Sequence, residues 1–274
     1  WQSSIDGGVT WVTINNVSAV YNYSNIIQTT LFRAVIQNGS CQSVNSTYAT
    51  ITVYPLSNGG TLNSSATVCS GSNNGTLLLT GYTGNVTQWE YSTDNGLTWN
   101  IVANTTDTLS YTNLTIKTLY RTLVQSGFCA SKYSTIVTIT VNAPSVGGIV
   151  AGTDTVCSGS NSGNLTLSGY VGSIKNWERS TDGGVTWISI ANVTALLNYV
   201  NINVTTNYRA VVQNGGCAAT NSSQAIITVF PLSVGGTLAP AAFAACSGIN
   251  SGTILLSGEA GTITHWEYSI DGGV

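Results

Sequence analysis

Charged side chains are scarce in this sequence. Of 274 residues, 7 are Lys or Arg and 10 are Asp or Glu, so 6% of the chain is charged, whereas a typical soluble domain has about 25%. Nucleic-acid binding depends on clustered Lys and Arg, so a net charge of -3 with scattered cations excludes a nucleic-acid partner. Disorder needs few apolar residues, and it is excluded because 42% of the chain is hydrophobic.

Histidine and long apolar runs are also scarce or missing. The chain has a single histidine, His265, and no His/Cys cluster, which excludes a zinc site and a Cys/His catalytic pair repeated in each unit. No window approaches the roughly 18 uninterrupted apolar residues that a membrane helix needs. The sequence therefore predicts no membrane span and no resident cofactor.

One phrase returns along the chain at a fixed period, which is the mark of a repeat protein. It reads WQSSIDGGVTW from Trp1, WEYSTDNGLTW from Trp89, WERSTDGGVTW from Trp177 and WEYSIDGGV from Trp266, at spacings of 88, 88 and 89 residues. One unit therefore has about 88 residues. Because the first and last nine residues share one phase of the repeat, we expect the chain to be a segment of a longer array.

Each unit is predicted to be an all-β sandwich. In the second unit, β-rich runs with a period of two alternate with short turns of Gly, Asn, Ser and Asp, and no stretch has a helical period. The runs cover residues 76–82, 86–92, 97–103, 109–114, 119–125 and 134–141. Six or seven such strands in about 88 residues are typical of an immunoglobulin-like or fibronectin III-like sandwich, with Trp89 and Trp177 in its core.

Single prolines followed closely by Gly-Gly mark the boundaries between units, near Pro55, Pro144 and Pro231. The predicted domains are residues 1–54, the C-terminal part of a repeat; 55–143 and 144–230, two complete repeats; and 231–274, the N-terminal part of a repeat. This linker composition allows one strand to end and the next to begin without a long flexible tether. We therefore expect the repeats to follow one another end to end as a rod.

Within the returning phrase, the pattern S-x-D-x-G-x-T-W resembles the Asp-box, a β-hairpin motif of sialidases and other β-propeller proteins. Its aspartate accepts hydrogen bonds from turn amides, its glycine supplies a positive φ, and its tryptophan packs behind the hairpin. These structural hairpin residues are Asp6, Asp94, Asp182 and Asp271 with Trp11, Trp99 and Trp187. Propeller boxes recur at about 40 to 50 residues, and a sialidase needs an arginine cluster that is absent here. We therefore predict no catalytic residue and no enzyme.

Two binding roles stay open beside the structural one. A calcium site needs six to eight oxygens and each hairpin offers one carboxylate, but backbone carbonyls are not visible in a sequence, so calcium at the domain junctions is an alternative. The two tryptophans of each phrase suggest an array that binds surface glycans, although hairpin packing favours a core role. The expected partners are neighbouring repeats of the same chain, with laterally associated copies through strand edges as an alternative.

Six cysteines, two per repeat, predict disulfides and an oxidising compartment. The favoured scheme pairs Cys69 with Cys129 and Cys157 with Cys217, and leaves Cys41 and Cys246 with partners outside the sequence. The alternative pairs Cys41 with Cys69, Cys129 with Cys157 and Cys217 with Cys246, which would link adjacent domains covalently. The favoured scheme instead closes each domain on itself, because both of its pairs lie at the same spacing within one repeat.

Taken together, the phrases VCSGSNSGNLTLSGYVGSIKNWERSTDGGVTW and NYRAVVQNGGCAATNSSQAIITV resemble the immunoglobulin-like repeats of very large surface adhesins of gliding and other Bacteroidota. The resemblance covers the whole chain in register. It implies export by the type IX secretion route, an extracellular location at the cell surface, and a role as a stalk or filament in attachment or gliding motility. Spacer domains of a secreted glycoside hydrolase are a further alternative.

Overall fold

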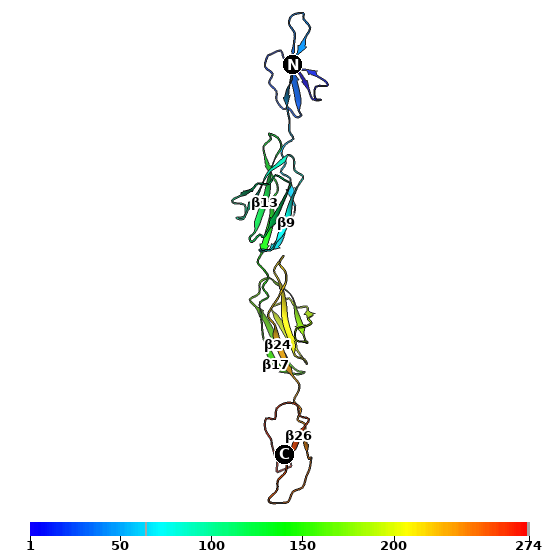
Figure 1. Cartoon of the computed structure of the whole chain (residues 1–274), viewed down its shortest axis with the longest axis vertical. Coiled ribbons are helices and arrows are strands. Elements are labelled where there is room, and N and C mark those ends of the chain that lie inside the picture. The colour runs from blue at the N-terminus through cyan, green and yellow to red at the C-terminus, as the bar shows by residue number, and fades with distance from the viewer. Residues whose placement is uncertain (64, 273–274) are drawn as a thin grey trace. The chain divides into compact units, whose positions relative to one another are not determined.

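The computed structural model describes residues 1–63 and 65–272, and these residues form strands and no helix. The chain divides into two units, Trp1–Asn142 and Ala143–Val274. Each unit holds one complete repeat and part of another (Figure 1). Within the described part of the chain, nothing qualifies as a membrane-crossing helix. The all-β fold with tandem immunoglobulin-like repeats is thereby confirmed.

The described residues of the complete repeat of unit 1, called repeat 2, form nine strands. They are β7 (Thr61–Leu62), β8 (Ala66–Cys69), β9 (Asn74–Thr80), β10 (Asn85–Ser92), β11 (Asn100–Val102), β12 (Thr108–Thr112), β13 (Thr118–Gln125), β14 (Lys132–Tyr133) and β15 (Val137–Asn142). One sheet has the order β12-β9-β7, and the other has the order β11-β10-β13-β15-β8 with β14 paired to β13. Figure 1 labels one strand of each sheet, β9 and β13.

The complete repeat of unit 2, called repeat 3, has the same topology. Its strands are β16 (Ile149–Ala151), β17 (Asp154–Cys157), β18 (Ser162–Ser168), β19 (Ser173–Ser180), β20 (Ile188–Ile190), β21 (Leu196–Val200), β22 (Thr206–Gln213), β23 (Thr220–Asn221) and β24 (Ala225–Phe230). The two sheets have the orders β16-β18-β21 and β17-β24-β22-β19-β20, with β23 paired to β22. In both repeats the pairing of the second strand with the last strand, β8 with β15 and β17 with β24, is parallel.

The flanking partial repeats contain fewer strands. Repeat 1 has β1 (Gln2–Ser4), β2 (Val12–Thr13), β3 (Thr30–Arg33) and β6 (Ala49–Ile51) in one sheet, and β4 (Val35–Ile36) with β5 (Val44–Asn45) as a separate pair. The described residues of repeat 4 form one strand pair, β25 (Thr237–Ala239) with β26 (Leu255–Ser257). These fragments expose many of the apolar side chains whose counterparts are buried in repeats 2 and 3, such as Trp266, which is 59% exposed.

The core of each complete repeat lies between its two sheets and is centred on the tryptophan that opens the phrase. Trp89 is fully buried, and so is its counterpart Trp177. Every second residue of β13 is buried, as expected for a strand with one face on the core. From the facing sheet, Leu77 and Leu79 of β9 pack into the same core. This alternation explains why a period of two in the sequence predicts the sandwich.

Candidate functional site

Each aspartate of the returning phrase lies in a hairpin turn and is bonded within that turn. In the turn between β10 and β11, Asp94 Oδ1 accepts hydrogen bonds from Ser92 Oγ at 2.7 Å and from the Thr98 amide at 2.9 Å. The Thr98 hydroxyl donates to Oδ2, and the Gly96 amide donates to Ser92 Oγ at 2.8 Å. The positive φ of Gly96, 89°, closes the turn.

The same hydrogen bonds recur at the other aspartates. Asp6 and Asp182 each accept hydrogen bonds from the serine two positions before and from the threonine four positions after. Asp271 accepts one from Ser269, and the last two residues of that phrase, 273 and 274, lie outside the described residues. The structure therefore places all four aspartates in local turn networks.

These bonds change the acidity of the aspartates. The pKa of Asp94 is lowered to about 2, with the Thr98 hydroxyl as the largest cause. The pKa values of Asp6 and Asp182 are lowered as well, chiefly by the Thr10 and Ser180 hydroxyls. Among the described residues no group of three or more His, Cys, Asp or Glu side chains could hold a metal ion. Calcium at the domain junctions stays a prediction.

Acid is expected to weaken the hairpins. A carboxylate with a lower pKa in the folded than in the unfolded chain stabilises the fold above its unfolded pKa of about 3.9, and this stabilisation is lost as the pH falls through the folded pKa. We expect the free energy of unfolding, measured by urea denaturation, to fall between about pH 4 and pH 2. In Asp94→Asn this fall should be smaller than in the unmodified chain, and an equal fall in both would contradict the role assigned to Asp94.

The hairpin tryptophan covers an arginine of the neighbouring strand. The Arg121 guanidinium on β13 lies 3.9 Å from the ring centroid of Trp99 and 3.8 Å from that of Tyr133. Its Nε donates to the carboxylate of Glu90 at 2.7 Å, and Glu90 is buried. The Trp99 Nε1 donates to the Gly96 carbonyl at 3.1 Å. The side chains thus form a closed stack on the outer face of the sheet.

This stack repeats at the period of the sequence. Arg209 lies 3.9 Å from the Trp187 ring and 2.7 Å from the Glu178 carboxylate. In repeat 1, Arg33 lies 3.9 Å from the Trp11 ring, but Gln2 replaces the glutamate and accepts the Arg33 hydrogen bond at 2.9 Å. Three of the seven Lys and Arg residues therefore occupy the equivalent position in three successive repeats.

In the two complete repeats, neither the tryptophan that opens the phrase nor the hairpin tryptophan is presented as a free ring for a sugar. Trp89 and Trp177 are fully buried, and their Nε1 atoms donate to the carbonyls of Thr106 and Thr194 at 2.9 Å. The hairpin tryptophans, Trp99 among them, have an arginine on the ring and a satisfied indole N–H. This geometry favours packing over glycan stacking.

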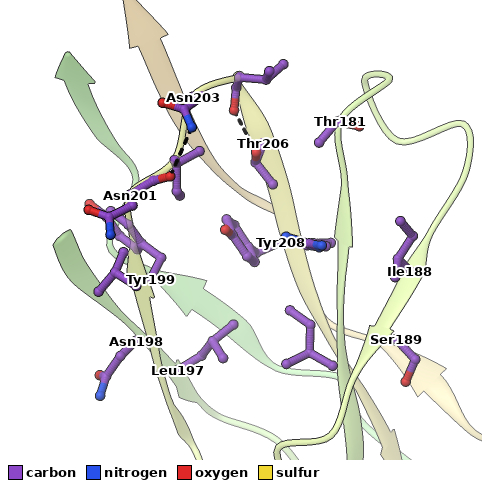
Figure 2. A pocket seen from close by; sticks show the side chains of 15 residues that line it. Thr181, Ile188, Ser189, Leu197, Asn198, Tyr199, Asn201, Asn203, Thr206 and Tyr208 are labelled. Atoms are coloured by element: carbon purple, nitrogen blue, oxygen red, sulfur yellow. Dashed lines mark hydrogen bonds between the residues drawn. The ribbon is translucent and has the colours of Figure 1, made fainter. Parts of the chain in front are cut away.

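A pocket of about 570 Å³ opens in repeat 3 between β20 and β21, the edge strands of the two sheets. Figure 2 shows Tyr208 at its centre, with Tyr199 on one side and Ile188 on the other. The lining has hydroxyl, amide and aliphatic groups and one arginine, without a carboxylate, histidine or cysteine. A pocket of about 360 Å³ surrounds Tyr120 at the matching position of repeat 2. Burial raises the pKa of Tyr120 to about 12, so this hydroxyl is a poor general base at neutral pH.

The segment before repeat 2 is bonded to that repeat. Ser57 Oγ accepts a hydrogen bond from the Ser126 amide at 2.9 Å. The Asn58 amide donates to the Thr83 carbonyl at 3.2 Å, and the Thr83 amide donates back at 3.0 Å. Linker residues that follow Pro55 are therefore part of the fold.

The segment before repeat 3 is held in the same way. Ser145 Oγ accepts a hydrogen bond from the Asn214 amide at 2.9 Å. Val146 and Val171 exchange backbone hydrogen bonds of 3.2 and 3.0 Å. These matched contacts show that Pro-containing segments are docked on the repeat that follows them.

In the two complete repeats, the first glycine of the Gly-Gly pair that follows the boundary proline packs against main chain. A Cβ at Gly59 would overlap the carbonyl of Tyr133, and a Cβ at Gly147 would overlap the carbonyl of Asn221. Both glycines are buried. At the matching position of repeat 4, a Cβ added to Gly235 would have no neighbouring atom within 4 Å.

Gly147→Ala is expected to destabilise repeat 3 because the added carbon meets backbone that has little room to move. We expect a loss of about 2 to 3 kcal/mol in the free energy of unfolding, the upper range for overpacking, measured by urea denaturation. Gly235→Ala is the matched control and should leave stability nearly unchanged. Equal effects of the two substitutions would show that the glycine contact is unimportant.

The two cysteines of repeat 2 lie at opposite ends of β13. Cys69 pairs in register with Asn142, beyond the end of β13 that begins at Thr118. Cys129 follows the other end, where its Sγ lies 3.5 Å from the Pro55 carbonyl. Eight strand residues separate these ends by about 26 Å, whereas the Cα atoms of a disulfide lie within about 7 Å.

The predicted disulfide pairs are therefore wrong. Cys69 and Cys217 are disulfide-bonded, whereas the thiols of Cys129 and Cys157 are free, which excludes both pairs of the favoured scheme. Cys41 and Cys246 are free as well, so the alternative scheme is not formed either. In repeat 3, Cys157 lies beside Phe230 and the Cys217 Sγ lies 3.2 Å from the Ala143 carbonyl. Cys157 and Cys217 therefore lie at opposite ends of the sandwich of repeat 3, as Cys69 and Cys129 do in repeat 2, so the two cysteines of one repeat cannot bond to each other.

The sequence model of one protein family, described as Domain of unknown function (DUF8696), matches residues 1–55, 58–143 and 146–231. The chain belongs to this family. Its three matches follow the repeat period found in the sequence. No curated protein matches the chain.

Among solved structures, this member of the DUF8696 family is similar to tandem immunoglobulin-like and fibronectin-like domains. Titin domains A168–A170 share 14% identity over 74% of this chain and 75% of theirs, with a TM-score of 0.41. Extracellular domains 3–5 of Drosophila OTK share 12% over 74% and 70%, with a TM-score of 0.38. Fibronectin(III)-like modules of Clostridium thermocellum CbhA share 13% over 61% and 90%, with a TM-score of 0.31.

Sequence reasoning missed the stacked arginine and its glutamate. The signal was present, because Arg33, Arg121 and Arg209 are 88 residues apart in a chain with few cations. An arginine held at one phase of a repeat indicates a fixed contact. Its partners, a tryptophan from the hairpin and a glutamate from β10, become visible only when the strands are paired.

Proposed function

We propose that this chain is a repetitive stalk segment of a secreted cell-surface adhesin, giving reach and mechanical strength for attachment or gliding motility. Tandem sandwich repeats fit a stalk or spacer in a cell-surface or extracellular protein. The finer parts of the proposal, namely adhesion, gliding and export by the type IX route, are supported by the resemblance of the repeat phrases to those of adhesins.

The observation that carries the proposal is the docking of the linkers. Ser57 and Ser145 both accept an amide hydrogen bond from the repeat that follows, and Gly59 and Gly147 fit against its main chain. A spacer keeps a set distance only if its connections are ordered. Docked linkers serve that purpose, and they would be unnecessary in a flexible tether.

Two further features favour an extracellular stalk. The disulfide-bonded state of Cys69 and that of Cys217 suit an oxidising compartment. The low charge leaves few exposed ion pairs for salt to screen, so the stability of the repeats should depend little on ionic strength. Lateral association of copies into a filament stays part of the proposal, because little electrostatic repulsion protects the strand edges.

Single-molecule pulling on the chain tests the mechanical part of the proposal. With thiols reduced, repeats 2 and 3 should each unfold in a separate event that releases about 300 Å of chain, as expected for about 88 residues. In Trp177→Ala, which removes the largest fully buried side chain of repeat 3, one of the two events should disappear. Extension without discrete events would contradict a load-bearing role.

Adhesion is tested separately in the cell that produces the protein. Removal of whole repeats in register should reduce attachment under flow, and insertion of unrelated immunoglobulin-like repeats of the same length should restore it. Restoration supports a spacer. If attachment is restored by the original repeats and not by the unrelated ones, the original repeats carry a binding surface, as in the glycan-binding alternative.

A further inference from the structure

The pocket of repeat 3 is lined by one charged side chain, that of Arg179, and by no carboxylate. The ion pairs of the described residues are formed by Arg121, Arg209 and His265. The guanidinium of Arg179 therefore has no carboxylate partner among the residues that the structure describes. An anionic group that entered the pocket would meet a positive charge that no neighbouring carboxylate neutralises.

Cross-strand pairing sets Arg179 beside the aromatic floor of the pocket. Arg179 on β19 lies opposite Tyr208 on β22 in the antiparallel ladder. Burial raises the pKa of Tyr208, and the charge of Arg179 acts against this shift, as expected for a cation close to the tyrosine hydroxyl. The Tyr208 ring stacks on that of Tyr199 with centroids 6.5 Å apart. The Tyr199 hydroxyl donates to Asp154 at 2.9 Å, and this carboxylate lies outside the lining.

The rest of the lining suits a sugar. Thr181, Asn198 and Asn201 bring hydroxyl and amide groups to the pocket, and Ile188 and Leu197 bring aliphatic surface (Figure 2). A saccharide presents hydroxyl groups at its ring edge and C–H groups on its ring faces, so it can use both kinds of surface. The volume of about 570 Å³ lies within the range of small-molecule sites, about 300 to 1,000 Å³.

We infer that the pocket of repeat 3 is a binding site for an acidic saccharide, whose carboxylate is bound by Arg179 and whose hydroxyl groups are bound by the amide and hydroxyl side chains of the lining. A guanidinium matches a carboxylate because its planar donors form two parallel hydrogen bonds with the two carboxylate oxygens. A uronic acid residue is the sugar that supplies both kinds of group. This site goes beyond the stalk role and does not depend on it.

Repeat 2 shows which residue determines the specificity. Its Tyr91 lies opposite Tyr120, as Arg179 lies opposite Tyr208 in repeat 3. Tyr120 stacks on Tyr111 with ring centroids 6.3 Å apart, so the aromatic floor is the same in both repeats. The pocket of repeat 2 is smaller, about 360 Å³, and has no charged side chain in its lining. Repeat 2 is therefore expected not to bind the acidic saccharide.

Titration of the whole chain with digalacturonic acid, a disaccharide of galacturonic acid, tests the inference by NMR. The disaccharide is added to about 10 mM, which detects dissociation constants in the millimolar range. The resonances of Arg179 and Tyr208 should shift and saturate, whereas those of Tyr120 should stay in place. The neutral galactose disaccharide with the same linkage should bind about tenfold more weakly, because it lacks the carboxylate that accepts the charged hydrogen bonds.

Variants of Arg179 separate recognition from folding. Arg179→Gln and Arg179→Tyr should each weaken binding about tenfold, and Tyr91 shows that the fold accommodates a tyrosine at this position. Lys175→Gln removes an exposed cation of β19 outside the pocket and should bind as the unmodified chain does. Urea denaturation establishes that each variant is folded. Absence of saturable shifts at Tyr208, equal shifts at Tyr120, equal binding of the neutral disaccharide, or unchanged binding in both Arg179 variants would overturn the inference.

Discussion

Trp89→Ala is expected to lower the free energy of unfolding of repeat 2 by about 3 to 5 kcal/mol, the range for removing a large buried aromatic side chain. Trp89 is fully buried between the sheets, and its Nε1 hydrogen bond to the Thr106 carbonyl, 2.9 Å long, is lost with it. Single domains are stable by about 5 to 15 kcal/mol. The substitution therefore removes a large share of the stability of repeat 2.

Limited proteolysis measures this effect repeat by repeat. Trp89→Ala should promote cleavage within residues 58–143 and leave residues 146–231 resistant, because neighbouring sandwiches have separate cores. Trp177→Ala, at the matched position, should give the reverse pattern. Cleavage of both repeats in either variant would show that the two cores unfold as one.

Arg121→Ala is expected to cost about 3 kcal/mol, because removal of one partner of a buried ion pair leaves the other charge uncompensated. Glu90 is 5% exposed and lies 2.7 Å from the Arg121 Nε. The ring contacts of Arg121 with Trp99 and Tyr133 are lost as well. Urea denaturation of the single variant gives the loss directly.

The double variant with Glu90→Gln separates the charge from the packing. Gln2 holds Arg33 in repeat 1 at 2.9 Å, so a glutamine fits this position of the stack. Glu90→Gln with Arg121→Ala should be more stable than Arg121→Ala alone, because no unpaired charge is then buried. A double variant as unstable as the single one would assign the whole effect to ring packing.

Much of the sandwich could be predicted from the sequence, because its long strands have one buried face. The six predicted runs correspond to β9, β10, β11, β12, β13 and β15. The short strands β7, β8 and β14 were missed, since two to four residues carry too little alternation to be recognised. They matter for the site, because β8 positions Cys69 and Tyr133 of β14 packs against Gly59.

The disulfide pairing could not be predicted, because cysteine spacing does not show at which end of a strand each cysteine lies. Two cysteines of one repeat, Cys69 and Cys129, look like partners until β13 is placed between them. The parallel pairing of β8 with β15 rules out a bond between Cys69 and Cys129, since it puts Cys69 beside Asn142, at the end of β13 opposite to Cys129. Similarly, docking of the linkers rests on contacts with Thr83 and Val171 that no local pattern reveals.

Amide hydrogen exchange of the linkers tests most directly whether they are ordered parts of a stalk. Asn58 and Val146 donate their amides to Thr83 and Val171, so we expect both amides to exchange far more slowly than those of an unfolded peptide and to approach the protection of Leu79 in β9. The corresponding Gly147→Ala variant should lose this protection at Val146. Exchange of Asn58 and Val146 at unfolded-peptide rates in the unmodified chain would contradict the account.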